Sequence, residues 1–338
     1  MKLGVDIYTI RSQGWNAFQI LDYCASIDLN LVHFSDLNSF ASTDDGYLAG
    51  VKAHADSLGL ALEVGMLSIC PTAAIFDASQ GTAVEQTRRM LHVARALGSP
   101  ILRCVLGSNA DRLRPPAKGS ALPLEAHMQA VVETCHAVRS LAMDLGIKLA
   151  IENHAGDMQG WELRQLIQAA GPEYVGACID SGNPVWVAED PMITLEHLAP
   201  YVLTSHVRDS AVCAHPLGAA VQWVAVGDGN VGIEAWIERY QELCPGAPLS
   251  LEIITGGMPR VLNYFEEAYW AAYPKARASE FARFERLVRR GQPYLGTTVT
   301  VAHGAEVPPE YQAAQTAQQR YDLERSVRYC RDTLGIGE

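Results

Sequence analysis

Short apolar runs alternate with longer amphipathic segments along most of the chain. Eight of these runs have the length and the branched or aromatic content of buried strands. They span residues 3–9, 30–36, 60–66, 100–107, 147–154, 174–180, 201–209 and 248–256. Between them, apolar residues recur at helical spacing, most clearly at Val131, Cys135, Val138, Ala142 and Leu145. The pattern predicts eight strands that alternate with helices.

A glycine ends four of the predicted helices, just before the next strand begins. These residues are Gly59, Gly98, Gly146 and Gly171, and each stands where a helix takes a left-handed residue at its C-terminus. Strands joined through helices form parallel sheets. Eight such units within 256 residues match a closed (β/α)₈ barrel, or TIM barrel, and the first turn lacks the GxGxxG of a dinucleotide-binding sheet. We therefore expect an α/β protein with a TIM barrel and a C-terminal helical extension.

The barrel pattern stops well before the end of the chain. We expect residues 1–258 to form a catalytic barrel domain and residues 259–338 to form an extension that packs on the barrel or on a partner subunit. A plain capping extension is the alternative. Within this part, the apolar and aromatic positions predict one helix over residues 261–273 and a last helix over residues 312–334.

Composition and charge narrow the classes of partner. Of the 338 residues, 49% are hydrophobic, and the formal net charge is −12. Nucleic acids and anionic membranes require clustered Lys and Arg, so we expect neither and favour a small neutral or metal-coordinated substrate. The 8 cysteines are scattered through apolar runs, as buried thiols of a reducing compartment are. Because no apolar segment is long enough to span a membrane, we expect a cytoplasmic protein, either a homo-oligomer or a hetero-subunit.

Polar side chains follow the apolar part of the last four predicted strands. They are Glu152, Asn153 and His154 in the fifth strand, Asp180 and Asn183 at and after the end of the sixth, His206 and Arg208 in the seventh, and Glu252 in the eighth. The chemistry of a TIM barrel lies at the C-terminal ends of its strands. Three carboxylates and one imidazole are therefore expected to converge there.

This combination is typical of a site for one divalent metal ion. Glu152, Asp180 and Glu252 offer oxygen ligands and His206 offers a nitrogen, with positions left open for substrate oxygens. Three close carboxylates repel one another, so either a cation neutralises them or their pKa values rise. We expect Mn²⁺, with Mg²⁺, Co²⁺ and Zn²⁺ as alternatives. Solvated strand ends or structural salt bridges are the other interpretation of these carboxylates.

Two residues lie one step beyond the expected ligands on the same strand faces. His154 shares its face with Glu152 and is a candidate acid or base, with an ordinary loop imidazole as the alternative. Arg208 stands in the same relation to His206. It could clamp a substrate hydroxyl, carbonyl or carboxylate, or it could have a structural partnership with Asp209 or another carboxylate.

Other candidates for substrate binding come from the strands and the loops after them. Arg103 lies inside the fourth strand and must find a carboxylate, so it is a substrate-binding candidate or a support of the metal site. Asn183 is a further candidate, and Trp186 could stack on a sugar ring or simply pack in its loop. The sequence GDGNVG (227–232) could cradle a phosphate or only allow a tight turn. Tyr8, His33 and Glu63 lie at plausible mouth positions of the first three strands, where we expect packing or hydrogen-bonding roles.

Five segments in the order IENH, CIDSGN, SHVRD, GDGNVG and LEI resemble the sugar isomerase/epimerase superfamily, which also contains xylose isomerase-like and endonuclease IV-like barrels. The resemblance covers residues 3–256 and implies that the four expected ligands bind one divalent ion. It also implies that the two glutamates, Glu152 and Glu252, exchange protons with the substrate. Asn153 stands where xylose isomerases have a lysine, and the acidic chain lacks the His-rich set and basic groove of endonuclease IV, which argues against DNA repair.

Together these features predict a metal-dependent sugar isomerase or epimerase. Glu152 or Glu252 would remove a proton next to a carbonyl, and the other glutamate or His154 would return one to the resulting enediolate. Loss of a β-leaving group from the same intermediate would instead make the protein a lyase, for example a dehydratase or an enzyme that cleaves 3-keto-glycosides. A non-catalytic barrel subunit that needs a partner chain is the third interpretation.

Overall fold

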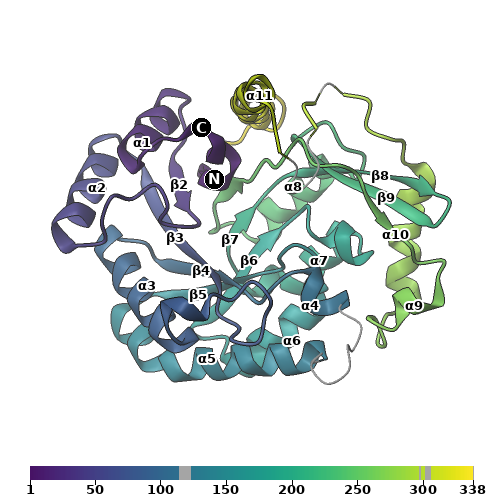
Figure 1. The fold of residues 1–338 in the computed structure, drawn as a ribbon, viewed down its shortest axis with the longest axis horizontal. Helices are drawn as coiled ribbons and strands as arrows, with labels where there is room; N and C mark the ends of the chain where they lie inside the picture. Colours follow the sequence, from purple (N-terminus) through teal and green to yellow (C-terminus); the bar gives the residue numbers. More distant parts are fainter. Residues whose placement is uncertain (114–122, 297, 301–305, 338) are drawn as a thin grey trace.

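Eight parallel strands form a barrel at the centre of the molecule (Figure 1). This computed structural model describes residues 1–113, 123–296, 298–300 and 306–337. The barrel strands are β1 (Leu3–Asp6), β2 (Leu31–Phe34), β3 (Ala61–Ser68), β4 (Ile101–Val105), β5 (Lys148–Glu152), β6 (Val175–Asp180), β7 (Val202–His206) and β10 (Leu249–Leu251). Their order is β10-β1-β2-β3-β4-β5-β6-β7. Each predicted apolar run overlaps one of them, with β3 extending past its run to Ser68, and the predicted TIM barrel is confirmed.

The barrel closes between β7 and β10 through a short seam. The backbone N–H of Val207 donates to the carbonyl of Ser250 at 2.7 Å, and the N–H of Glu252 donates to the carbonyl of Val207 at 3.0 Å. These bonds form a parallel bridge between Val207 and Leu251. Because His206 and Glu252 are the chain neighbours of this bridge, closing the barrel also sets the position of both residues.

Helices surround the barrel (Figure 1). The α-helices of this layer are α1 (Ala17–Ser26), α2 (Asp45–Ser57), α3 (Ala83–Leu97), α4 (Asn109–Leu113), α5 (Leu124–Leu145), α6 (Gly160–Ala170), α7 (Pro191–Leu198) and α8 (Ile233–Leu243). Short 3-10 helices are η1 (Ile7–Gln13), η2 (Ala78–Gln80), η3 (Pro184–Val187) and η4 (Ala199–Tyr201). As predicted, α3 and α5 each end at a left-handed glycine, Gly98 with φ 72° and Gly146 with φ 68°.

A three-stranded antiparallel sheet projects from the barrel after β7. It consists of β8 (Asp209–His215), β9 (Gly218–Val224) and β11 (Arg260–Leu262), in the order β11-β9-β8. The prediction of one strand over residues 201–209 is therefore wrong at its end, because β7 stops at His206 and Asp209 already pairs with Val224 in the hairpin.

The predicted helix over residues 261–273 is also wrong. Val261 pairs with Ala220 in the small sheet, and only a short helix, α9 (Glu267–Trp270), follows. The aromatic residues of this stretch serve a different purpose, because Tyr264 and Tyr269 pack in a separate apolar cluster with residues of α10 (Ala278–Arg290). Their spacing reflects that cluster rather than one face of a helix.

The last helix, α11 (Pro309–Arg328), continues into a π-helical turn, η5 (Tyr329–Thr333), and lies beside the N-terminus (Figure 1). The backbone N–H of Ser12 donates to the side chain of Gln319 at 3.0 Å, and the Tyr23 hydroxyl donates to Glu324 at 3.0 Å. Leu323 is buried in the core of the barrel layers. The prediction of a helix over residues 312–334 is confirmed in its main part, and the boundary near residue 258 stays a prediction.

Two further sequence-based expectations can be compared with the structure. All eight cysteines lie in the described part of the chain, where each is buried and has a free thiol. Among the described residues, no helix combines the length and the apolarity that a membrane span requires.

A buried carboxyl group connects the start of α6 to α7. The Glu189 side chain, 1% exposed, accepts hydrogen bonds from the backbone N–H of Gly160 at 2.9 Å and from the Thr194 hydroxyl. Burial raises the pKa of Glu189 from 4.5 to about 8. The folded state therefore prefers the protonated carboxyl group.

We predict that the Glu189→Gln variant loses part of the pH dependence of stability. A carboxyl group whose pKa is raised to about 8 on folding stabilises the protein fully below pH 4.5 and loses this contribution as the pH rises to 8. The native protein should lose up to about 1.4 kcal/mol per pH unit in this window from this one group. Urea unfolding at several pH values measures the slope. Glu196→Gln, on the exposed face of α7, is the control, and equal slopes in all three proteins would contradict the prediction.

Candidate metal centre at the mouth of the barrel

Four side chains from neighbouring strands meet at the C-terminal end of the barrel. Glu152 ends β5, Asp180 ends β6, His206 ends β7, and Glu252 follows β10. One possible ligand atom from each, three carboxylate oxygens and one imidazole nitrogen, lies within 4.8 Å of all the others. All four side chains are buried. The structure therefore brings together the four residues that the sequence predicted as metal ligands.

The register of the strands and one amide side chain fix this arrangement. Asp180 lies directly opposite His206 in the β6–β7 pair. The side chain of Asn153 bonds the backbone of Asp180 twice, donating from Nδ2 to its carbonyl at 2.9 Å and accepting its N–H on Oδ1 at 2.9 Å. Asn153 thus continues the pairing of β5 and β6 past the end of β5. This explains why an amide follows directly after Glu152.

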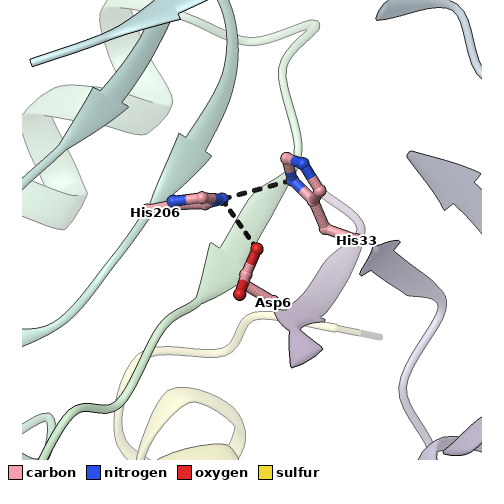
Figure 2. Close-up of side chains that lie close together, drawn as sticks. All are labelled: Asp6, His33 and His206. Carbon is pink, nitrogen blue, oxygen red and sulfur yellow. Dashed lines mark hydrogen bonds and ion pairs between the residues drawn. The ribbon is translucent and has the colours of Figure 1, made fainter. Parts of the chain in front are cut away.

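His206 lies at the centre of the site, and its two ring nitrogens face different groups. Its Nδ1 lies 3.1 Å from Oε2 of Glu152 and 3.3 Å from Oε2 of Glu252. Its Nε2 lies 3.3 Å from Oδ2 of Asp6 and 3.2 Å from Nδ1 of His33 (Figure 2). Burial opposes protonation of the ring, but the surrounding carboxylates outweigh it and hold the pKa of His206 well above its ordinary value.

Two buried arginines compensate part of the negative charge. Arg103 donates to Oε2 of Glu152 from Nε at 2.6 Å and lies 2.5 Å from the same oxygen through Nη2. Arg208 contacts both Asp180 and Glu252 through Nη2. Arg208 thus pairs with these two carboxylates, which resolves the question of whether its partner is Asp209. Both predicted substrate-binding arginines therefore lie against the expected metal ligands.

The same charges set the protonation of the three carboxyl groups. Burial alone would raise each pKa. For Glu152, Arg103 and His206 outweigh burial and hold the pKa well below its usual range. For Glu252, Arg208 and His206 lower the pKa to about 2. For Asp180, burial and the neighbouring carboxylates outweigh Arg208 and raise the pKa to about 7.

The donor set and several unpaired atoms fit a divalent cation. In the part of the chain that the structure describes, Nδ1 of His206 has no hydrogen-bond partner, and neither do Nε and Nη1 of Arg208. Each buried donor without a partner costs about 1–3 kcal/mol. In its position between the two carboxylates, the Arg208 guanidinium therefore leaves part of its hydrogen-bonding capacity unused. Three carboxylate oxygens and an imidazole nitrogen are ligands that Mn²⁺, Mg²⁺ and Zn²⁺ accept. The cluster could therefore hold one metal ion.

A column of stacked side chains supports Arg208 from outside the barrel. The guanidinium carbon of Arg208 lies 4.4 Å from the ring centroid of Trp223, and Trp223 stacks on Trp186 at 4.0 Å with an 8° angle between the rings. Arg260 covers the other face of Trp186 at 4.5 Å. Gly182 leaves room for this column, because a Cβ there would collide with the Arg208 side chain. Both faces of Trp186 are occupied, so a sugar could contact only the edge of its ring.

Two further predicted residues are held firmly near the cluster. Nδ1 of His154 lies 2.6 Å from the carbonyl oxygen of Gly107, which can only accept, so Nδ1 carries the hydrogen and Nε2 has the lone pair. Burial lowers the pKa of His154, which favours the neutral ring. The Asp157 carboxylate accepts the backbone N–H of His154 at 2.9 Å. Asn183 donates from Nδ2 to Oε1 of Glu152 at 3.2 Å.

Two groups without a predicted role in the metal site lie close to His206. Asp6 had no expected role, and His33 was expected to pack or hydrogen-bond, yet both lie at its Nε2. Asp6 lies opposite His33 in the β1–β2 pair. Two polar residues at matching positions of neighbouring apolar strands are the sequence signal that could have indicated a role inside the barrel. The Cys178 thiol also lies close enough to share an ion with Glu152 and His206. Burial raises the pKa of Cys178 to about 12, which keeps this thiol neutral.

The glycine-rich loop at residues 227–232 does not offer its donors to a phosphate. Oδ2 of Asp209 accepts the backbone N–H of Gly229 at 2.9 Å and that of Gly227 at 3.2 Å. An internal carboxylate therefore occupies the place that an anion would take. The possibility that this loop cradles a phosphate is contradicted.

Comparisons with known proteins match both sequence and fold. The sequence pattern of the family described as "Xylose isomerase-like TIM barrel" matches residues 14–273. No curated protein sequence matches the chain at a significant level.

Solved structures of similar fold include two sugar epimerases and one magnesium complex. A D-psicose 3-epimerase determined with D-fructose has a TM-score of 0.58 and 15% identity, over 99% of this chain and 100% of its own. A D-psicose 3-epimerase from Clostridium cellulolyticum H10 with D-tagatose has a TM-score of 0.56 and 13% identity, over 96% of this chain and 99% of its own. A xylose isomerase-like TIM barrel protein from Mycobacterium smegmatis in complex with magnesium has a TM-score of 0.58 and 13% identity, over 85% and 97%. At this level of identity the likeness establishes the fold.

We predict that Arg208→Met destabilises the protein only when divalent ions are removed. Without the guanidinium, Asp180 and Glu252 lose a buried counter-charge, which should lower the free energy of unfolding by about 3–5 kcal/mol in EDTA. Excess Mn²⁺ should restore most of this loss by supplying positive charge at the same carboxylates. Urea unfolding in EDTA and in Mn²⁺ measures both values, with Arg95→Met on the surface of α3 as the control. An equal loss in the two conditions would contradict the prediction.

Proposed function

The chain belongs to the family of xylose isomerase-like TIM barrels, and we propose that it is a divalent-metal-dependent isomerase or epimerase of a carbohydrate. The observation that carries this proposal is the buried set of Glu152, Asp180, His206 and Glu252 at the mouth of the barrel. Structures of similar fold include D-psicose 3-epimerases determined with D-fructose and D-tagatose. They support a small sugar as the class of substrate.

The four residues of this set would hold one ion. Mn²⁺ is the ion that we expect for three oxygens and one nitrogen, with Mg²⁺, Co²⁺ and Zn²⁺ as alternatives. When bound, the ion would polarise a substrate carbonyl and neutralise charge that develops on its oxygen. The magnesium complex of the relative from Mycobacterium smegmatis supports a divalent ion in this fold.

The two glutamates supply the proton transfer. Both carboxylates lie near Nδ1 of His206, at 3.1 Å for Glu152 and 3.3 Å for Glu252. Arg103 fixes the Glu152 carboxylate and keeps it ionised, and the low pKa of Glu252 keeps that group ionised as well. One ionised glutamate would take the proton from the carbon next to the carbonyl, and the other would return one to the enediolate after it has taken up a proton from solvent or from a substrate hydroxyl.

Other side chains would orient the substrate. Arg208 has two buried N–H groups without partners in the described chain, and these could donate to substrate oxygens once the side chain leaves the carboxylates. Asn183 holds Glu152 by a hydrogen bond from Nδ2, and its Oδ1 is free to accept a hydroxyl within the described structure. The edge of Trp186 has an unpaired N–H that could serve the same purpose.

A lyase of the same family is the second candidate function, and His154 favours it. An epimerase returns a proton to carbon, which the second glutamate could do, whereas β-elimination needs an acid that protonates the leaving group, a role that His154 could take beside a glutamate base. His154 is anchored through Nδ1, so its Nε2 can accept a proton and pass it on. The two functions differ in the product and not in the metal site.

Proton exchange separates the two functions and tests both. We predict that the protein with Mn²⁺ and candidate ketoses or 3-keto-glycosides in D₂O places deuterium next to the carbonyl, as NMR detects. An intact sugar would identify an isomerase or epimerase, and release of an aglycone or of water would identify a lyase. Glu252→Gln should slow the exchange roughly 10²- to 10⁴-fold because it removes a proton-transfer group.

The matched control for this experiment is Glu238→Gln, which lies on the exposed face of α8 and should leave the rate unchanged. Metal content of the purified protein is measured in parallel. If the native protein holds no divalent ion, or if Glu252→Gln exchanges as fast as the native protein, the proposed function is wrong.

A further inference from the structure

A second layer of polar side chains lies behind the candidate metal centre, on the three strands at the other side of His206. Asp6, His33 and Glu63 occupy β1, β2 and β3 at matching positions, because Asp6 pairs with His33 and His33 pairs with Glu63 in the register of the sheet. All three side chains are buried. The function proposed above uses none of them.

This layer contacts the candidate metal centre through the imidazole ring of His206. Nε2 of His206 lies 3.3 Å from Oδ2 of Asp6 and 3.2 Å from Nδ1 of His33, and Figure 2 shows both groups turned toward that nitrogen. The opposite nitrogen, Nδ1, faces Glu152 and Glu252. His206 therefore stands between acceptors on one side and the expected metal ligands on the other.

We propose that Asp6, with the help of His33, is a positioning residue for His206. A neutral imidazole carries one hydrogen, and the nitrogen that carries it cannot bind a metal ion. By accepting the single hydrogen of Nε2, Asp6 keeps it away from Nδ1 and holds the ring so that the Nδ1 lone pair points at the metal site. Nδ1 of His33, which also lies 3.4 Å from Oε2 of Glu63, lies against the same ring nitrogen. This inference rests on the metal site of the proposed function.

Asp6 is itself held in the right orientation. Its Oδ1 accepts the backbone N–H of Tyr8 at 2.8 Å and the Ser35 hydroxyl at 2.9 Å. Its Oδ2 has no hydrogen bond within the described residues, so the nearby N–H of His206 is the donor available to it. Oδ1 of Asp6 thus accepts the hydrogen bonds that hold the carboxylate in place, whereas Oδ2 faces His206.

The same residues suggest one competing arrangement. Asp6, His33 and His206 are close enough to share an ion of their own. That ion would need Nε2 of His206 as its ligand and would push the hydrogen to Nδ1, so the two arrangements exclude each other for a neutral ring. We favour the outer site because its cluster has three carboxylates, two of which face Nδ1, whereas the inner one has a single carboxylate at Nε2.

Asp6→Asn is the decisive variant. Its amide oxygen can replace Oδ1 toward Tyr8 and Ser35, which preserves the turn, and its NH₂ group then faces the N–H of His206. We expect the dissociation constant for Mn²⁺, measured by isothermal titration calorimetry, to rise roughly 10- to 100-fold, as is typical when such a support is lost. Thermal unfolding in EDTA should be close to that of the native protein.

Two variants of His33 and a control complete the series. His33→Asn can offer an oxygen near the position of Nδ1 and should bind Mn²⁺ nearly as well as the native protein, whereas His33→Leu should bind it more weakly. Asp111→Asn is the matched control, because Asp111 is also buried and accepts two backbone N–H groups, from Ala74 at 2.7 Å and Ser108 at 2.9 Å. Its affinity for Mn²⁺ should not change.

A spectroscopic readout separates positioning from a general loss of structure. In the Mg²⁺-loaded protein with ¹⁵N-labelled histidine, the ring of His206 should carry its hydrogen on Nε2, and this pattern should be lost in Asp6→Asn. The assignment follows from the signal that disappears in His206→Asn.

The outcomes are distinguishable from a failure of the proposed function. If the native protein binds no divalent ion, the proposed function and this inference both fall. If the native protein binds one ion and Asp6→Asn binds it equally tightly, only the positioning role is wrong. Two ions per chain by elemental analysis, one of them lost in both Asp6→Asn and His33→Leu, would overturn it in favour of the inner site.

Discussion

The repulsion among three buried carboxylates at one rim of the barrel is the constraint on which the rest of the site depends. Glu152, Asp180 and Glu252 lie on strands whose positions the backbone hydrogen bonds fix, so the groups cannot move apart. Away from water, each unpaired charge costs several kcal/mol. Two guanidinium groups and one imidazole compensate this charge within the described chain. The fold therefore maintains three carboxylates that need positive charge nearby, either from the arginines and His206 or from a bound cation.

The two arginines compensate this charge in different ways. Arg103 is committed to Glu152 through two nitrogens and forms a permanent part of the site. Arg208 spans two carboxylates but leaves two donors unpaired, and it rests on the face of Trp223 in the small antiparallel sheet. A segment inserted after β7 thus supports the positive charge that contacts Asp180 and Glu252. The hairpin that interrupts the regular alternation of strands and helices therefore contributes to the site.

The regular part of the fold and the four expected ligands could be predicted because both follow from local patterns. Apolar runs mark the strands. Because the C-terminal ends of parallel strands meet at one rim of a barrel, the sequence alone indicated that Glu152 and Asp180 lie close together. The hairpin after β7 could not be predicted, because β7 and β8 are separated by only two residues and their apolar pattern runs through Val207. Asp6 and His33 lie inside apolar strands, and only the register of the sheet shows that they reach His206.

The central claim is that one divalent cation occupies the space among four side chains that come from distant parts of the sequence. Anomalous X-ray diffraction from crystals soaked in Mn²⁺ tests it most directly, since manganese is located independently of the protein atoms. The account predicts a single strong peak among the side chains of Glu152, Asp180, His206 and Glu252, with Arg208 turned away from Asp180. A crystal with no peak there, and with Arg208 still between the two carboxylates at saturating Mn²⁺, would contradict it.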